Sequence, residues 1–195
     1  MFYETKLGSG LVLDPFKSIV VPRPIGWIST LSPEGVANLA PYSFYNAFSE
    51  RPYYVAFGTG GHKDSLHNAE ATGEFVVNLA TFDLREAMNA SSTNQQVDEF
   101  VLAGLEKAAS RLVKPPRVAK SPVALECKHF QTVPLPDDDG QARNWLVIGK
   151  VLGVHIDDAY IKDGRVDVAA MRPIARLGYA EYATVESIWR MRRPN

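Results

Sequence analysis

The amino-acid sequence predicts a mainly β fold, a β-barrel core with short helices around it. Six or more segments carry the β-branched and aromatic residues that favour strands, and turn residues separate these segments. The helical patterns between them are few and short. An α/β sheet would need longer helices alternating with the strands, so a barrel fits the order of the segments better.

Length and composition indicate one soluble globular domain. The chain has 195 residues, of which 46% are hydrophobic and 22% charged, enough for a real core. Its net charge of −1 predicts neither nucleic acid nor an anionic membrane as a partner. The single cysteine, Cys127, excludes an internal disulfide and suits a reducing compartment. There is no signal-peptide pattern and no run of 18 apolar residues, so we expect a cytoplasmic protein.

In the first half of the chain we expect four strands and one helix. The strands are expected at 18–31, 36–42, 53–57 and 74–80, and the helix at 64–72. Ser32-Pro33-Glu34-Gly35 has the pattern of a type I turn, so the first two strands should form a hairpin. Asp64 or Ser65 is the expected N-cap of the helix, and Gly73 is placed to end it.

In the second half, two short helices are expected before two longer strands. The helices are expected at 83–90 and 97–103, the strands at 123–133 and 145–156, and a turn at 137–140. In the first of these strands, alternation places Cys127 on one face with its apolar neighbours and Glu126 on the other face.

Residues 23–30, RPIGWIST, have strand character although prolines stand at 22 and 24. Proline cannot donate to a sheet ladder, so we expect this backbone to be extended but unpaired. Free N–H and C=O groups are costly to bury unless something satisfies them. A flat heterocycle with alternating donors and acceptors would do so. Residues 46–49, NAFS, are expected to form a loop that adds an amide and a hydroxyl.

A glycine-rich loop, GTGGHKDS at 58–65, leads from a strand end into the expected helix start. Glycines let backbone N–H groups converge, and the first free amides of a helix favour an anion. Lys63 would add a charge and Ser65 a hydroxyl donor. The spacing does not match a Walker P-loop, so a nucleoside triphosphate is a poor candidate. The alternative is a purely structural turn followed by an N-cap.

Other familiar sites are not indicated. Gly8-Ser9-Gly10 lacks the setting of a dinucleotide fingerprint, and no GxSxG elbow occurs. The four histidines do not show metal-site spacing. Cys127 is expected to be a buried small hydrophobe rather than a nucleophile.

Taken in order, these segments resemble the flavin reductase-like family, the FMN-binding split β-barrels. The resemblance covers residues 15 to 155 and is carried by RPIGWIST at 23–30, NLAPYSF at 38–44, NAFS at 46–49, Arg51-Pro52, KDS at 63–65, TGEFVVNL at 72–79 and VIGKV at 147–151. The segment RLGYAEYA at 176–183 resembles longer members of the family. The resemblance implies one domain over 1–195, a Greek-key split barrel with a C-terminal extension from about 157.

The resemblance also implies a homodimer that holds one FMN per subunit near the interface. The residues it places at the cofactor are Arg23, Trp27, Ile28, Ser29, Thr30, Asn46, Ala47, Ser49, Lys63, Asp64 and Ser65. Positions 27–30 would line the flavin with backbone groups, 46–49 would meet the ring edge, and 63–65 would hold the phosphate. A surface ion pair is the alternative role for Arg23, and a core position the alternative for Trp27.

The implied activity is hydride transfer from NADH or NADPH to flavin, with a partner monooxygenase or another acceptor downstream. Many members carry a histidine just before the final long strand, on the nicotinamide side. Here the corresponding stretch, QARNW at 141–145, has none. Two alternatives therefore stay open: an FMN-binding electron-transfer protein of the flavoredoxin type, reduced by another protein, and a barrel that binds no flavin.

The C-terminal residues ESIWRMRRP at 186–194 bring three arginines together. The simpler expectation is a solvated basic tail. The alternative is that Arg176, Tyr179 or this tail reaches over the flavin of the neighbouring subunit.

Overall fold

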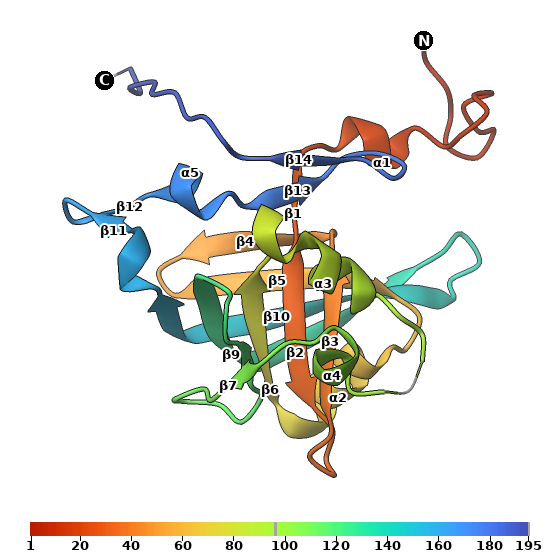
Figure 1. Cartoon of the computed structure of the whole chain (residues 1–195). Coiled ribbons are helices and arrows are strands. Elements are labelled where there is room, and N and C mark those ends of the chain that lie inside the picture. The colour runs from red at the N-terminus through yellow and green to blue at the C-terminus, as the bar shows by residue number, and fades with distance from the viewer. Residues whose placement is uncertain (96, 195) are drawn as a thin grey trace.

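The structure is a computed structural model that describes residues 1–95 and 97–194. Seven antiparallel strands curl into a barrel in the order β3-β2-β6-β9-β10-β5-β4 (Figure 1). Their bounds are β2 Gly26–Leu31, β3 Ala37–Tyr42, β4 Tyr45–Glu50, β5 Tyr53–Gly60, β6 Glu74–Leu79, β9 Val123–Pro136 and β10 Ala142–Ile156. The predicted mainly β barrel is confirmed.

Strand β2 lies inside the sheet, and the prediction that residues 23–30 stay unpaired is wrong. β2 pairs with β3 along its whole length and with β6 from Gly26 to Ser29. Pro22 and Pro24 both precede β2, so neither removes a donor from its ladder. Its side chains from Gly26 to Thr30 are all buried because both faces of the sheet are covered here.

One face of the sheet encloses the barrel core, which helix α2 (Asp64–Thr72) closes at one end. Leu66 and Ala69 of α2 pack against Ile28, Phe57 and Phe75 from three strands. The helix has the predicted bounds, and Gly73 ends it in the left-handed conformation with φ of 74°. Its N-cap is Lys63, without a side-chain hydrogen bond, so the prediction of Asp64 or Ser65 as N-cap is wrong.

The opposite face of β2 and β3 carries a second apolar cluster under the short helices. Trp27 and Leu39 pack there against Met88 and Phe100. The helices are η1 (Phe82–Leu84), α3 (Arg85–Ala90) and α4 (Glu99–Leu102). The Trp27 indole donates to Ser91 Oγ at 2.9 Å, which satisfies the one polar atom of this buried side chain.

A segment from the N-terminal part of the chain and two from the C-terminal part form a small sheet above the barrel (Figure 1). β1 (Arg23–Pro24) pairs with β13 (Ile174–Arg176), which pairs with β14 (Tyr182–Thr184). The Arg23 guanidinium donates to the carbonyl oxygens of Lys17, Val20 and Leu177 and so joins both ends. The remaining short elements are α1 Phe16–Ile19, β7 Lys107–Ala108, β8 Arg117–Val118, η2 Asp158–Tyr160, β11 Ile161–Lys162, β12 Arg165–Val166 and α5 Val168–Met171.

One further expectation is corrected. Residues 46–49 lie in the edge strand β4, paired with β5, rather than in a loop. Glu126 was expected on the strand face opposite Cys127 and its apolar neighbours, and its side chain there is fully buried. The loop at 111–113 folds over that face, and its N–H groups donate to the Glu126 carboxylate. The alternation of residues along one strand does not show whether a distant loop covers one of its faces.

Within residues 1–95 and 97–194, none of the helices is both long and apolar enough to cross a membrane.

Candidate functional site

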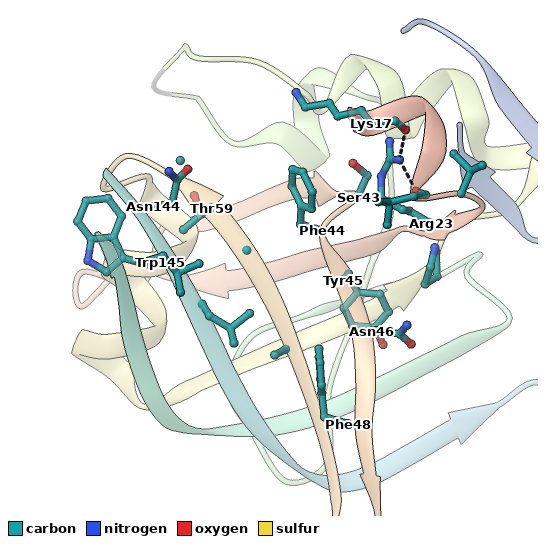
Figure 2. A pocket seen from close by; sticks show the side chains of 18 of the residues that line it. Lys17, Arg23, Ser43, Phe44, Tyr45, Asn46, Phe48, Thr59, Asn144 and Trp145 are labelled. Carbon is teal, nitrogen blue, oxygen red and sulfur yellow. Dashed lines mark hydrogen bonds between the residues drawn. The ribbon is translucent and has the colours of Figure 1, made fainter. Parts of the chain in front are cut away.

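A cavity of about 870 Å³ opens where β4, β5 and β10 meet the segment that joins α1 to β1. Figure 2 shows Phe44, Tyr45, Asn46 and Trp145 around this hollow, with Arg23 and Lys17 at one end. Most of the exposed lining is apolar, and no aspartate, glutamate or histidine belongs to it among the described residues. The cavity therefore suits a large, flat and mostly apolar group.

A second, more polar cavity of about 440 Å³ adjoins the first. The two share Lys17, Ser43, Phe44 and the backbone of 58–60. The polar cavity continues past this shared wall to Lys63, Asp64 and Ser65 at the start of α2. One molecule with a flat head and a polar tail could therefore occupy both spaces.

The start of α2 presents donors to the polar cavity. The N–H groups of Asp64 and Ser65 have no acceptor among the described residues, as expected for the first turn of a helix. The buried Ser65 hydroxyl accepts from Asn38 Nδ2 at 2.9 Å, which leaves its own hydrogen free to donate. Lys63 is exposed beside them and adds a positive charge. An anionic group fits this set of donors.

The glycine loop contributes less than its sequence suggests. β5 runs through Gly60, so the amides of this stretch belong to the barrel. The Gly58 N–H donates to the Phe44 carbonyl at 2.6 Å, and the Gly61 N–H donates to the Arg143 carbonyl at 3.0 Å. The expectation of converging glycine amides is therefore corrected to a site made by α2 and nearby side chains.

Two buried titratable groups also face the polar cavity. Tyr42 Oη is buried and has no hydrogen-bond partner among the described residues. Burial raises the pKa of this phenol. Burial also raises the pKa of Glu99, whose carboxylate accepts from the Leu39 N–H at 2.9 Å. A bound molecule with hydroxyl groups could satisfy Tyr42 Oη.

The structure separates the sequence-predicted site residues into three groups. Arg23 and Asn46 line the large cavity, and Lys63, Asp64 and Ser65 line the polar one. Trp27, Ile28, Ser29 and Thr30 line neither cavity. Ala47 and Ser49 are exposed on β4, also outside both linings, and the Ser49 hydroxyl donates to the Pro52 carbonyl.

The group from Trp27 to Thr30 already has its hydrogen-bond partners inside the protein. The ladder takes up its backbone, the Ser29 hydroxyl donates to the Pro116 carbonyl, and Thr30 Oγ1 accepts from Asn38 and Asn68. These residues support the site from behind: Thr30 and Ser65 share Asn38 as a donor. Because the β2 backbone is paired with β3 and β6, its amides are not free to meet a heterocycle, and that expectation is wrong.

Sequence reasoning missed several lining residues. Phe44, Tyr45, Trp145 and Asn144 come from a strand end and from the start of β10, and Lys17 comes from α1. The one available signal was the aromatic density of 42–45, YSFY, directly before the polar NAFS stretch. The position of Lys17 depends on how α1 folds back, which no local pattern shows.

Residues 18–170 match the family described as flavin reductase like domain. The chain belongs to the flavin reductase-like family. Its structure matches FMN-binding split barrels, and the family binds FMN.

Individual family members and structures are similar over most of the chain. An uncharacterised protein of Halalkalibacterium halodurans is 34% identical over 182 residues, 90% of this chain and 87% of that protein. The crystal structure of nitrilotriacetate monooxygenase component B from Bacillus cereus has a TM-score of 0.85 at 25% identity, covering 94% of this chain and 100% of that one. An FMN-binding domain of a flavin reductase-like enzyme from Shewanella baltica OS155 shares the fold, with a TM-score of 0.72 at 17% identity over 92% and 96% of the chains.

The residues of this flavin reductase-like protein fit FMN. The large cavity is apolar where an isoalloxazine ring would lie, and Asn46 supplies an amide at its edge. The unpartnered Tyr42 hydroxyl and the free amides of Asp64 and Ser65 lie where a ribityl phosphate would extend. Such a cofactor needs an apolar surface for its ring and hydrogen-bond donors for its phosphate, and the two cavities offer both.

Proposed function

We propose that this protein is an FMN-dependent flavin reductase that takes a hydride from NADH or NADPH. The observation that carries the proposal is the joined pair of cavities, one apolar and broad, the other polar and ending at the start of α2. Family membership supports the flavin. When bound, FMN supplies the redox chemistry, accepting a hydride at N5.

In this proposal the protein binds and orients. Phe44 and Trp145 line the apolar cavity and would pack against the flavin ring, and Asn46 would supply an amide to the ring edge. Lys63, Ser65 and the first amides of α2 hold the phosphate. Asp64 contributes its backbone N–H, whereas its carboxylate would repel a phosphate.

No described side chain lining the large cavity is a histidine or a carboxylic acid. The stretch 141–145, where the family resemblance leads to the expectation of a histidine, has none, and its residues Asn144 and Trp145 line the cavity. Hydride transfer between stacked rings needs orientation rather than a protein acid or base. A lining without a histidine or a carboxylic acid is compatible with that requirement.

We also propose that the protein acts as a homodimer. The edge strand β4 is exposed from Asn46 to Glu50, and Phe44 and Phe48 expose apolar surface at the mouth of the large cavity. An uncovered edge strand with apolar side chains favours association. A second subunit placed there would cover the open side of the flavin.

The test is an anaerobic titration of the FMN-loaded protein with NADH and with NADPH, followed at the flavin absorbance band. Catalytic bleaching by either nicotinamide is the expected result. Retained FMN without bleaching would contradict the reductase and favour the electron-transfer alternative, in which a partner protein reduces the flavin. A protein that takes up no FMN would exclude both.

A further inference from the structure

A third hollow, of about 200 Å³, lies between the large cavity and the small sheet of the chain ends. We call it the cationic hollow, because Lys17, Arg23 and Arg176 line it and no described lining residue is acidic. It shares Lys17, Arg23 and Ser43 with the large cavity. The hydroxyl-bearing residues Ser92, Tyr179 and Tyr182 complete its polar wall.

The two arginines face each other without a counter-ion. Arg23 and Arg176 are direct partners in the β1–β13 register. Like charges in this position destabilise a sheet. Arg23 is 5% exposed, its Nε has no acceptor among the described residues, and its NH groups bind only carbonyl oxygens. Burial, and next the charge of Arg176, lower the pKa of Arg23. An anion in the hollow would relieve this repulsion.

The outer side of the hollow is available to a ligand. Arg176 donates to the Tyr182 hydroxyl and the Tyr179 carbonyl, so its charge remains uncompensated. Lys17 is exposed, has no acidic partner among the described residues, and lines all three cavities. The polar cavity differs in charge: its two lysines, Lys17 and Lys63, are balanced by Asp64 and Glu99.

These observations distinguish two anion sites that both adjoin the large cavity. FMN carries one phosphate, which the proposed function assigns to the start of α2. We propose that the cationic hollow binds the pyrophosphate of the pyridine nucleotide while the nicotinamide ring enters the large cavity. This inference rests on the proposed function. In this assignment Lys17 and Arg176 contact the pyrophosphate. The buried Arg23 fixes the backbone beside them, because it donates to the carbonyl oxygens of Lys17 and Leu177, and it adds positive charge to the hollow.

The test measures binding of ADP-ribose, which carries the pyrophosphate but no nicotinamide, to the FMN-loaded protein by calorimetry. Lys17→Gln and Arg176→Gln should each weaken ADP-ribose binding roughly three- to tenfold, the loss expected for one charge-assisted contact at a partly exposed site. Arg176→Lys should restore part of the affinity. In Arg176→Gln the dissociation constant of FMN should stay within about twofold, because Arg176 lines neither flavin cavity. Lys162→Gln, a charge change outside the three cavities, is the matched control and should bind ADP-ribose as the wild type does.

Three results would overturn the assignment: no ADP-ribose binding to the wild type, unchanged binding in both glutamine variants, or a loss of FMN affinity in Arg176→Gln instead. The last result would place the flavin phosphate in the hollow. Lys17→Gln keeps the test decisive should Arg176→Gln disturb the Tyr182 contact, because Lys17 has no side-chain partner to lose among the described residues. Failure of the proposed function is read separately, from wild-type flavin that neither nicotinamide bleaches.

Discussion

Gly149 shows how one residue fixes the packing of the barrel. It lies in β10, and a Cβ added to it would overlap the Phe75 ring and lie 3.2 Å from Cys127 Cβ. Both neighbours are fully buried in the barrel core and cannot move aside cheaply. The glycine is therefore required by space rather than by backbone conformation.

We predict that Gly149→Ala lowers the free energy of unfolding by about 1–3 kcal/mol, the usual cost of overpacking a core. Urea denaturation of the purified variant measures the change. Gly153→Ala on the same strand is the matched control, since its Cβ would meet the end of the exposed Leu112 side chain at 3.1 Å. A smaller loss is expected there, and equal losses would contradict the packing argument.

Glu126 is a second residue whose role is set by burial. Burial alone would raise the pKa of its carboxyl, but the Arg111 N–H, His155 and the Leu112 N–H stabilise the charged form and hold the pKa below its ordinary value. The donors at 111 and 112 lie 2.7 and 2.5 Å from the carboxylate oxygens. A carboxylate with a lowered folded pKa contributes stability above its unfolded pKa and loses it as the pH falls through the folded value.

Glu126→Gln should therefore lower the free energy of unfolding at pH 7. Below the ordinary carboxyl pKa of 4.5, the stability of the variant should fall less steeply with decreasing pH than that of the wild type. The glutamine NH₂ would also face backbone donors, which adds to the loss at neutral pH. Urea denaturation between pH 3 and pH 7 tests this, with Glu106→Gln at an exposed site as the control. Parallel stability curves for wild type and Glu126→Gln would refute the role given to the carboxylate.

At the scale of elements, the C-terminal segment is held by a close approach to α1. A Cβ on Gly178 would overlap the Ser18 hydroxyl and lie 2.8 Å from Ser18 Cα. The Leu177 carbonyl beside it accepts from Arg23 at 2.6 Å. The contact of α1 with the segment after β13 thus depends on the missing side chain at 178.

We predict that Gly178→Ala loosens this contact without unfolding the barrel, since Gly178 lies outside the seven-strand sheet. Limited proteolysis should cleave the variant faster within residues 177–185, while its thermal unfolding midpoint changes little. Ser18→Ala serves as comparison: its hydroxyl is buried without a partner, so its loss should leave cleavage unchanged. Equal cleavage of wild type and Gly178→Ala would show that the contact does not hold the segment.

Most of the larger elements could be predicted, because their signals are local. Helix α2 has a clear stop at Gly73, and the Ser32–Gly35 turn closes as expected, with the Gly35 N–H donating to the Ser32 carbonyl at 2.9 Å. β4 was missed because its polar residues read as a loop, although pairing with β5 makes it a strand. The first expected strand, at 18–31, proved to be α1, β1 and β2, because prolines mark breaks that periodicity does not resolve.

At the scale of the whole molecule, the site could be predicted only in part. Residues 63–65, predicted to hold a phosphate, lie at a helix start, which sequence can show, and they line the polar cavity. The large cavity depends on strands and segments far apart in the chain, from Lys17 to Trp145. Of the residues predicted at the cofactor, Trp27 to Thr30 are buried in the barrel wall and line neither cavity, because both faces of β2 are covered.

The central claim is that a flavin occupies the joined cavities with its phosphate at the start of α2. Flavin fluorescence titration with FMN and with riboflavin, on wild type and Lys63→Gln, tests it directly. We expect one FMN per chain, bound at least about tenfold more tightly than riboflavin. In Lys63→Gln the difference in affinity between the two flavins should become smaller. Equal affinity of the wild type for both flavins, or a gap that Lys63→Gln leaves unchanged, would contradict the account.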